Sequence, residues 1–214
     1  LVKVMALDAR AEVYSKQEDT TLEQADLEEI LYMPDLTEEL EGHNKLAYLR
    51  KRGQVASELG KIHILSENQY QKERALELYC TSIDFITQAL NLSPDLAPEV
   101  IDSDSHKLVQ IGLGRIYQQA AVLAVDTNHE YNRAVDITNA GIEFIKSLWD
   151  PEPMVLGLDP EVAKLLAPLR TDTTLQRVMR SLTFAKAIAF KHKNNPDLDE
   201  AYRLFVEASG FEGH

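Results

Sequence analysis

The protein has 214 residues, of which 44% are hydrophobic, and a formal net charge of −13 at pH 7. This length supports a hydrophobic core in one domain or two small ones. The acidic charge argues against nucleic acid as the main partner, because neutralising phosphates requires clustered Lys and Arg. No uncharged apolar run approaches the ~20 residues of a membrane-spanning helix, so we expect no membrane span.

The single cysteine and the N-terminal sequence bear on the compartment. Cys80 alone cannot form an intramolecular disulfide or a cysteine-based zinc cluster. The segment LVKVMALDAR becomes polar too early for a secretory signal. The cytoplasm is therefore the expected location. Because the sequence does not begin with Met, an upstream targeting segment would not be visible.

The charge is distributed unevenly along the chain. The stretch from Gln17 to Asn44 holds ten acids and no Lys or Arg, whereas the remaining residues hold 25 acids and 22 bases. One interpretation is a solvated acidic face. The other is a module that docks on a basic surface, either of the same chain or of a partner.

The first 44 residues are expected to form an acidic helical extension. Residues 1–7 (LVKVMAL) are ambiguous between helix and strand. Thr20-Thr21-Leu22-Glu23 has the pattern of a capping box, which predicts a helix over residues 22–32 that ends at Met33-Pro34. Asp35-Leu36-Thr37-Glu38 resembles a second box.

The rest of the chain, residues 45–214, is predicted to form one helical domain. Apolar residues at helical spacing predict long helices over 45–65, 72–92, 106–125, 131–148 and 173–192, and a last helix over 197–208. A short helix is expected after Asp159-Pro160. No segment alternates as a half-buried strand does. The predicted class is all-α, with about seven to nine helices in three antiparallel hairpins (about 45–93, 105–149 and 173–209) and an insert over 150–172.

Small residues at particular helix positions predict close contact within the hairpins. A glycine inside a helix costs roughly 1 kcal/mol relative to alanine, so a packing reason is expected for it. Leu113-Gly114-Arg115-Ile116-Tyr117 is followed by Tyr131-Asn132-Arg133-Ala134, and Leu59-Gly60 and the segment 199–208, with Ala201, repeat parts of the pattern. These motifs resemble the tetratricopeptide repeat, which implies stacked helix hairpins in a superhelix.

The spacing of the motifs differs from that family. Its period is about 34 residues, whereas Ser82, Ala134 and Ala201 are separated by 52 and 67 residues. Ala75 could replace Ser82 as the alanine site of the first hairpin. The alternative is an unrelated helical bundle in which these small residues coincide.

No pattern of residues predicts catalysis, a cofactor or a metal site. Glu-x-x-His, His-x-x-x-His, Gly-x-Ser-x-Gly and phosphate-binding glycine motifs are all absent from the sequence. Cys80 and His63 are expected to be packed side chains, and Trp149 to close the end of a hairpin. Asp102, Asp104 and His106 could hold a metal, but helix capping is the favoured role.

The resemblance implies a concave groove that binds an extended peptide or a helix. Its register places these residues in the groove: Gln54, Ser57, Lys61, Ile111, Arg115, Gln118 and Gln119. Lys61 and Arg115 would be adjacent cations that could bind a carboxylate or an acidic peptide, unless each pairs with a local acid such as Glu58. We therefore expect a non-catalytic scaffold or adaptor protein. The alternative is a small-ligand-binding accessory protein of the kind associated with transport, and an undetected enzyme is a third possibility.

Overall fold

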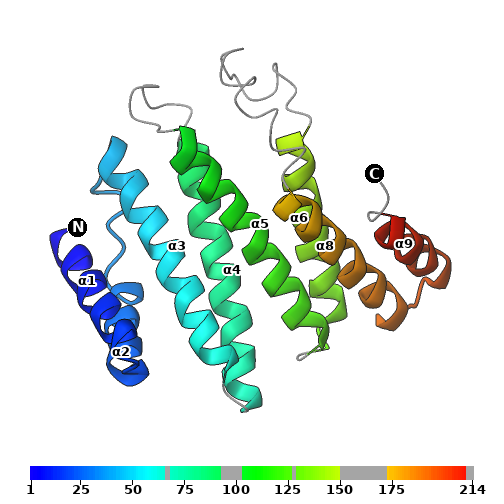
Figure 1. The fold of residues 1–214 in the computed structure, drawn as a ribbon, viewed down its shortest axis with the longest axis horizontal. Coiled ribbons are helices and arrows are strands. Elements are labelled where there is room, and N and C mark those ends of the chain that lie inside the picture. Colours follow the sequence, from blue (N-terminus) through cyan, green and yellow to red (C-terminus); the bar gives the residue numbers. More distant parts are fainter. Residues whose placement is uncertain (66–67, 93–102, 127–128, 150–172, 211–214) are drawn as a thin grey trace. The chain divides into compact units, whose positions relative to one another are not determined.

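A computed structural model describes residues 1–65, 68–92, 103–126, 129–149 and 173–210 of the chain (Figure 1). These residues form eight helices and no strand, which confirms the all-α class. The helices are α1 (Val2–Lys16), α2 (Thr20–Leu31), α3 (Gly42–Ile64), α4 (Gln69–Leu92), α5 (Ser103–Asp126), α6 (Tyr131–Trp149), α8 (Thr173–His192) and α9 (Leu198–Gly210). They belong to two compact units, Leu1–Ile101 and Asp102–His214, which are described separately below. None of the described helices is both long and apolar enough to cross a membrane.

In the first unit, helices that follow one another in the chain pack side by side, α1 on α2, α2 on α3 and α3 on α4. The packing agrees with a helical-repeat arrangement. One core cluster draws on all four helices: Val4, Leu7, Ala11, Leu27, Ile30, Leu31, Tyr48, Val55, Ala56, Leu59 and Leu78. The N-terminal hairpin α1–α2 therefore shares a core with α3.

The ambiguous first segment of the chain is helix α1. Its apolar residues lie on two faces, since Val4 and Leu7 are buried whereas Val2 and Met5 are exposed. Because both faces are apolar, the segment lacks the one-sided pattern from which a surface helix is predicted. Helix α2 begins at Thr20, two residues before the predicted range 22–32, because the side chain of Asp19 caps it by accepting a hydrogen bond from the backbone N–H of Leu22.

Acids of the stretch from Gln17 to Asn44 pair with bases of their own unit. Asp26 is buried, and both its carboxylate oxygens accept hydrogen bonds from Arg10, at 2.7 and 2.5 Å. Asp35 lies 3.8 Å from the guanidinium of the buried Arg52. The stretch is thus part of the folded unit, and part of its negative charge is used within the unit.

Helices α3 and α4 approach most closely at two glycines of α3. A Cβ atom at Gly60 would lie 3.1 Å from the ring of Tyr79, which agrees with the close contact predicted at Gly60. Gly53 permits a still closer approach, since a Cβ there would lie 2.5 Å from Cγ1 of Ile86. Gly53 lies outside the Leu-Gly motif from which the contact at Gly60 was predicted.

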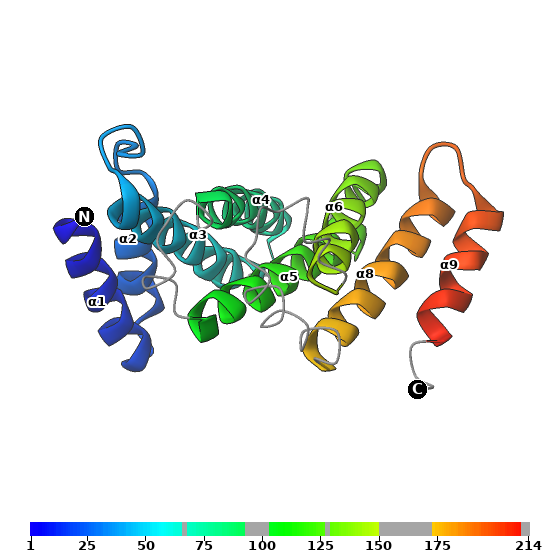
Figure 2. The same cartoon turned by 90° about the horizontal axis from the view of Figure 1, so that it is seen from above.

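In the second unit, α8 packs against both helices of the preceding hairpin, α5 and α6, and α9 packs against α8 (Figures 1 and 2). Ala134 and Ala201 are buried, as the close-contact hypothesis requires. Gly114 was expected to face α6, the partner helix of its own hairpin, but its nearest neighbour is in α8. A Cβ at Gly114 would lie 3.4 Å from Leu175 of α8, so this glycine mainly admits the next hairpin.

Helices α5 and α6 approach each other closely at Gly141 of α6. A Cβ there would lie 3.0 Å from Cβ of Tyr117 and 3.0 Å from Leu182 of α8, so Gly141 lies at the junction of three helices. The side chains of Asp102, Asp104 and His106 and the whole insert 150–172, with its predicted short helix, lie outside the described residues.

Candidate functional site

The groove positions predicted on α3 differ in accessibility. Gln54 and Lys61 are exposed, whereas Ser57 is buried and so is not on the accessible face. Lys61 forms no ion pair within the described part of the chain, although Glu58, one turn earlier, is close enough to influence it electrostatically. Helix α3 therefore presents a cation that is free to meet a partner.

The predicted positions on α5 lie along one accessible face. Arg115 is exposed, and Ile111, Gln118 and Gln119 are partly exposed. Leu108, which is 68% exposed, and Val122 extend this face in both directions at seven-residue spacing. We call this surface the α5 face, defined by Leu108, Ile111, Arg115, Gln118, Gln119 and Val122.

Arg115 lies in the middle of the α5 face without a charged partner. No carboxylate among the described residues forms an ion pair with it. A guanidinium in this position offers two parallel donors to a carboxylate that arrives from outside. Lys61 and Arg115 belong to different compact units, so their proximity stays a prediction.

Helix α8 adds positive charge beside α5. Residues 173–196 hold no Asp or Glu but five bases, Arg177, Arg180, Lys186, Lys191 and Lys193, in a chain whose net charge is −13. The ammonium group of Lys193 lies 4.0 Å from the ring centroid of Phe190, so this cation rests on an aromatic ring. Phe184 is half-exposed, and its ring makes an edge-on contact with Phe205 of α9.

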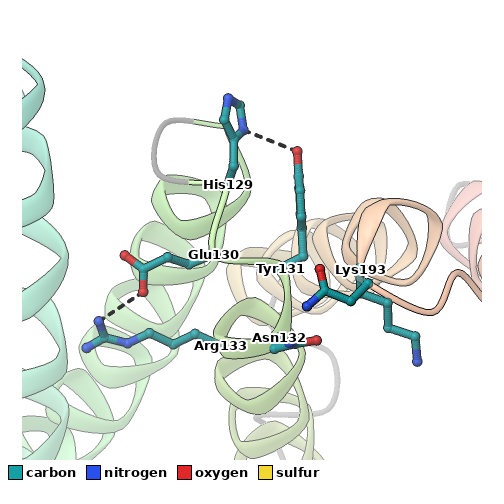
Figure 3. A pocket seen from close by; sticks show the side chains of 7 residues that line it. His129, Glu130, Tyr131, Asn132, Arg133 and Lys193 are labelled. Carbon is teal, nitrogen blue, oxygen red and sulfur yellow. Dashed lines mark hydrogen bonds and ion pairs between the residues drawn. The ribbon is translucent and has the colours of Figure 1, made fainter.

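An open pocket of about 300 Å³ lies where the α5–α6 turn meets the end of α8 (Figure 3). It is lined by His129, Glu130, Tyr131, Asn132, Arg133, Lys193 and Asn194. The ring of Tyr131 stacks between two imidazoles, with centroids 5.8 Å from His129 and 5.5 Å from His192. The Tyr131 hydroxyl lies 3.2 Å from Nδ1 of His129. This stack fastens the α5–α6 turn to the end of α8.

The charged groups of this pocket do not converge on one point. Arg133 turns toward Glu130, to which it donates a hydrogen bond of 3.2 Å, and Lys193 extends away from Tyr131 (Figure 3). The described lining holds a single carboxylate, that of Glu130, and no Ser, Thr or Cys, and its one hydroxyl, that of Tyr131, is hydrogen-bonded to His129. The pocket is therefore a polar recess held by an aromatic stack.

Residues with potential chemistry elsewhere are engaged in packing. His63 is buried, and its Nδ1 is hydrogen-bonded to Gln71, while Cys80 is partly buried on α4. Among the residues that the structure describes, no three His, Cys, Asp or Glu side chains are grouped as a metal site requires. The surface with the clearest binding chemistry is thus the α5 face with the adjoining basic helix α8.

Comparisons with models of protein families, with curated proteins and with solved structures found no match for this chain.

Proposed function

We propose that the protein is a non-catalytic scaffold that binds a segment of a partner protein along the α5 face. The observation that carries the proposal is the exposed Arg115, which no described carboxylate neutralises, on a face that also presents Leu108 and Val122. An apolar surface with one central cation fits a peptide or helix that carries apolar side chains and a carboxylate.

The chemistry of this face indicates how a partner would bind. Leu108 and Val122 supply apolar area, whose burial contributes about 25 cal/mol per Å². Arg115 supplies orientation, because a bidentate pair with Asp or Glu has a defined geometry. Gln118 and Gln119 can donate and accept hydrogen bonds with a peptide backbone. The partner segment is therefore proposed to be acidic and amphipathic.

The tetratricopeptide-like motifs and Lys61 support the same function. In repeat proteins the first helices of successive hairpins form the peptide-binding surface, and α3 and α5 are the helices that precede α4 and α6 in the chain. Lys61 is the exposed cation of α3. We propose that it adds to the attraction for an acidic partner, as a charge that steers association.

The test is capture of partners from a native extract by the wild type and by a Lys61→Glu/Arg115→Glu variant. Lys146→Glu, a charge reversal at an exposed position of α6, is the matched control. We expect the control to retain the partners of the wild type and the double variant to lose them. The proposal that partners bind at the α5 face would be wrong if the double variant captured the same partners as the wild type, with its helical content and thermal unfolding unchanged.

The alternative function, a small-ligand-binding accessory protein, calls for a different kind of site. Ligand sites of that type are mostly enclosed and apolar. The pocket beside His129 is open and lined by polar side chains. Partner binding therefore remains the proposal.

A further inference from the structure

Helix α9 carries a second apolar stripe besides its core face. Ala201, Leu204 and Ala208 are buried. Leu198, Tyr202 and Val206 follow one another at four-residue spacing and are 63%, 72% and 52% exposed. Residues four apart lie on one side of a helix, so these three form a continuous strip, which we call the α9 stripe.

The earlier hairpin of the same unit shows where a following helix packs. When Ala134 of α6 is aligned with Ala201 of α9, Tyr131, Val135 and Asn139 take the positions of Leu198, Tyr202 and Val206. These three side chains of α6 are partly exposed, and the ring of Tyr131 stacks at 5.5 Å on His192 of α8. The first helix of the following hairpin thus contacts α6 at the start of this row. The α9 stripe is suited to a helix in the corresponding position.

Helix α1 presents a matching stripe in the other unit. Val2, Met5 and Val13 are 84%, 62% and 49% exposed, and the exposed Ala6 and Ala9 lie among them. We call these five residues the α1 stripe. Its two alanines leave room for the backbone of another helix to approach closely. The stripe is separate from the core face of α1.

The two hairpins that carry these stripes have opposite formal charges. Residues 1–44, which include α1 and α2, hold twelve acids and three bases, a formal charge of −9. Residues 173–210, which include α8 and α9, hold four acids and six bases, a formal charge of +2. Opposite charges steer two surfaces together and suppress pairing of like with like.

We propose that the α9 stripe binds the α1 stripe of a second copy of this chain. Both helices expose an apolar face, α8 contacts α6 at the position that corresponds to the start of the α9 stripe, and the charges favour the pairing of unlike hairpins. Such a contact is heterologous, because it joins two different surfaces, so a third copy can add in the same way. This self-association uses neither Arg115 nor the rest of the α5 face, and it does not depend on the proposed partner.

The test is the molar mass in solution as a function of protein concentration, measured by sedimentation velocity or light scattering. We expect the mass of the wild type to rise with concentration and to fall when salt is added. Met5→Asp and Tyr202→Asp each place a charge in one stripe, and each variant alone should stay monomeric. Tyr70→Asp, at an exposed site on α4, is the control and should associate as the wild type does.

A mixture of the two variants gives the decisive result. Met5→Asp keeps an intact α9 stripe and Tyr202→Asp keeps an intact α1 stripe, so an equimolar mixture should form a dimer that grows no further. Val2→Asp with Leu198→Asp repeats the test at different positions, should one of the first variants fail to fold. A wild type that is monomeric at every concentration would overturn the proposal. Association by Met5→Asp alone would also overturn it, because a symmetric α9–α9 contact would then be present.

Discussion

The hydroxyl of Ser82 donates a hydrogen bond of 2.6 Å to the backbone carbonyl oxygen of Gly53, so helix α4 contacts the backbone of helix α3 directly. This contact is possible because Gly53 has no side chain. Gly60 lies seven residues further along the same face of α3 and admits the ring of Tyr79. The packing of α3 against α4 therefore depends on Gly53 and Gly60 and on the side chains of α4 that lie over them.

Replacing Gly53 by alanine should destabilise the protein. The added Cβ would lie 2.5 Å from Cγ1 of Ile86 and 3.3 Å from the backbone oxygen of Ser82, so the helices must separate. Overpacking of this kind costs about 1–3 kcal/mol. Gly112→Ala is the matched control, because no atom lies within 4 Å of its added Cβ, and alanine in a helix is favoured by roughly 1 kcal/mol. Urea unfolding of the two variants should give shifts of opposite sign.

Ser82→Ala should lower the free energy of unfolding by about 0.5–1.5 kcal/mol, the usual net contribution of one hydrogen bond. The lost donor is the buried hydroxyl that binds Gly53. Thr81→Ala removes a neighbouring hydroxyl that donates a hydrogen bond of 2.9 Å to the backbone oxygen of Glu77 within the same helix. If the two variants unfold at the same urea concentration, the hydrogen bond between the helices contributes no more to the free energy of unfolding than the one within α4.

The ion pair of Arg10 and Asp26 should contribute more to the free energy of unfolding than an ion pair at the surface. Arg10→Met leaves the carboxylate of Asp26 buried without a cation. The side chain of Arg10 is half-exposed, so we expect a loss of about 1–2 kcal/mol, below the 3–5 kcal/mol of a fully buried pair. Lys3→Met breaks the exposed pair with Glu29 and should change stability little. Equal effects of the two substitutions in thermal unfolding would contradict this ranking.

Burial raises the pKa of Tyr79 to about 12. An unfolded chain releases this proton near its ordinary pKa of about 10. The folded state therefore binds the proton more tightly, and the associated stability is present below pH 10 and is lost as the pH rises toward 12. In urea unfolding at a series of alkaline pH values, the free energy of unfolding should fall more steeply with pH for the wild type than for Tyr79→Phe. Parallel curves would show that Tyr79 ionises normally.

The helices themselves were predictable because most of them bury a single apolar face. The predicted range 173–192 coincides with α8, and the other long helices differ by a few residues at their ends. Helix α1 was ambiguous because it is apolar on two faces. The prediction that Gly114 faces α6 was wrong, because its nearest neighbour is in α8. The spacing of residues within one helix does not tell which other helix packs against a given turn. Gly53 was missed because it lies outside the Leu-Gly motif.

The candidate surface was predictable in part. Helical periodicity alone places Arg115, Gln118 and Gln119 on one side of α5, and the structure finds that side accessible. The absence of acids over 173–196 is visible in the sequence, but it belongs to no repeat or catalytic motif and so did not enter the prediction. The proximity of Lys61 and Arg115 depends on how two units are placed, which no periodic pattern within one helix determines.

Photo-crosslinking from position 119 tests the proposed binding role most directly, because Gln119 lies on the α5 face and its replacement leaves Arg115 in place. A benzophenone amino acid is introduced in place of Gln119, and in a separate control in place of Lys146 on α6, and the protein is irradiated in a native extract. We predict crosslinked peptides from position 119 that come from an acidic, amphipathic segment of one partner, with few or none from position 146. Equal labelling from both positions, or none from position 119, would contradict the account of the α5 face as a partner-binding surface.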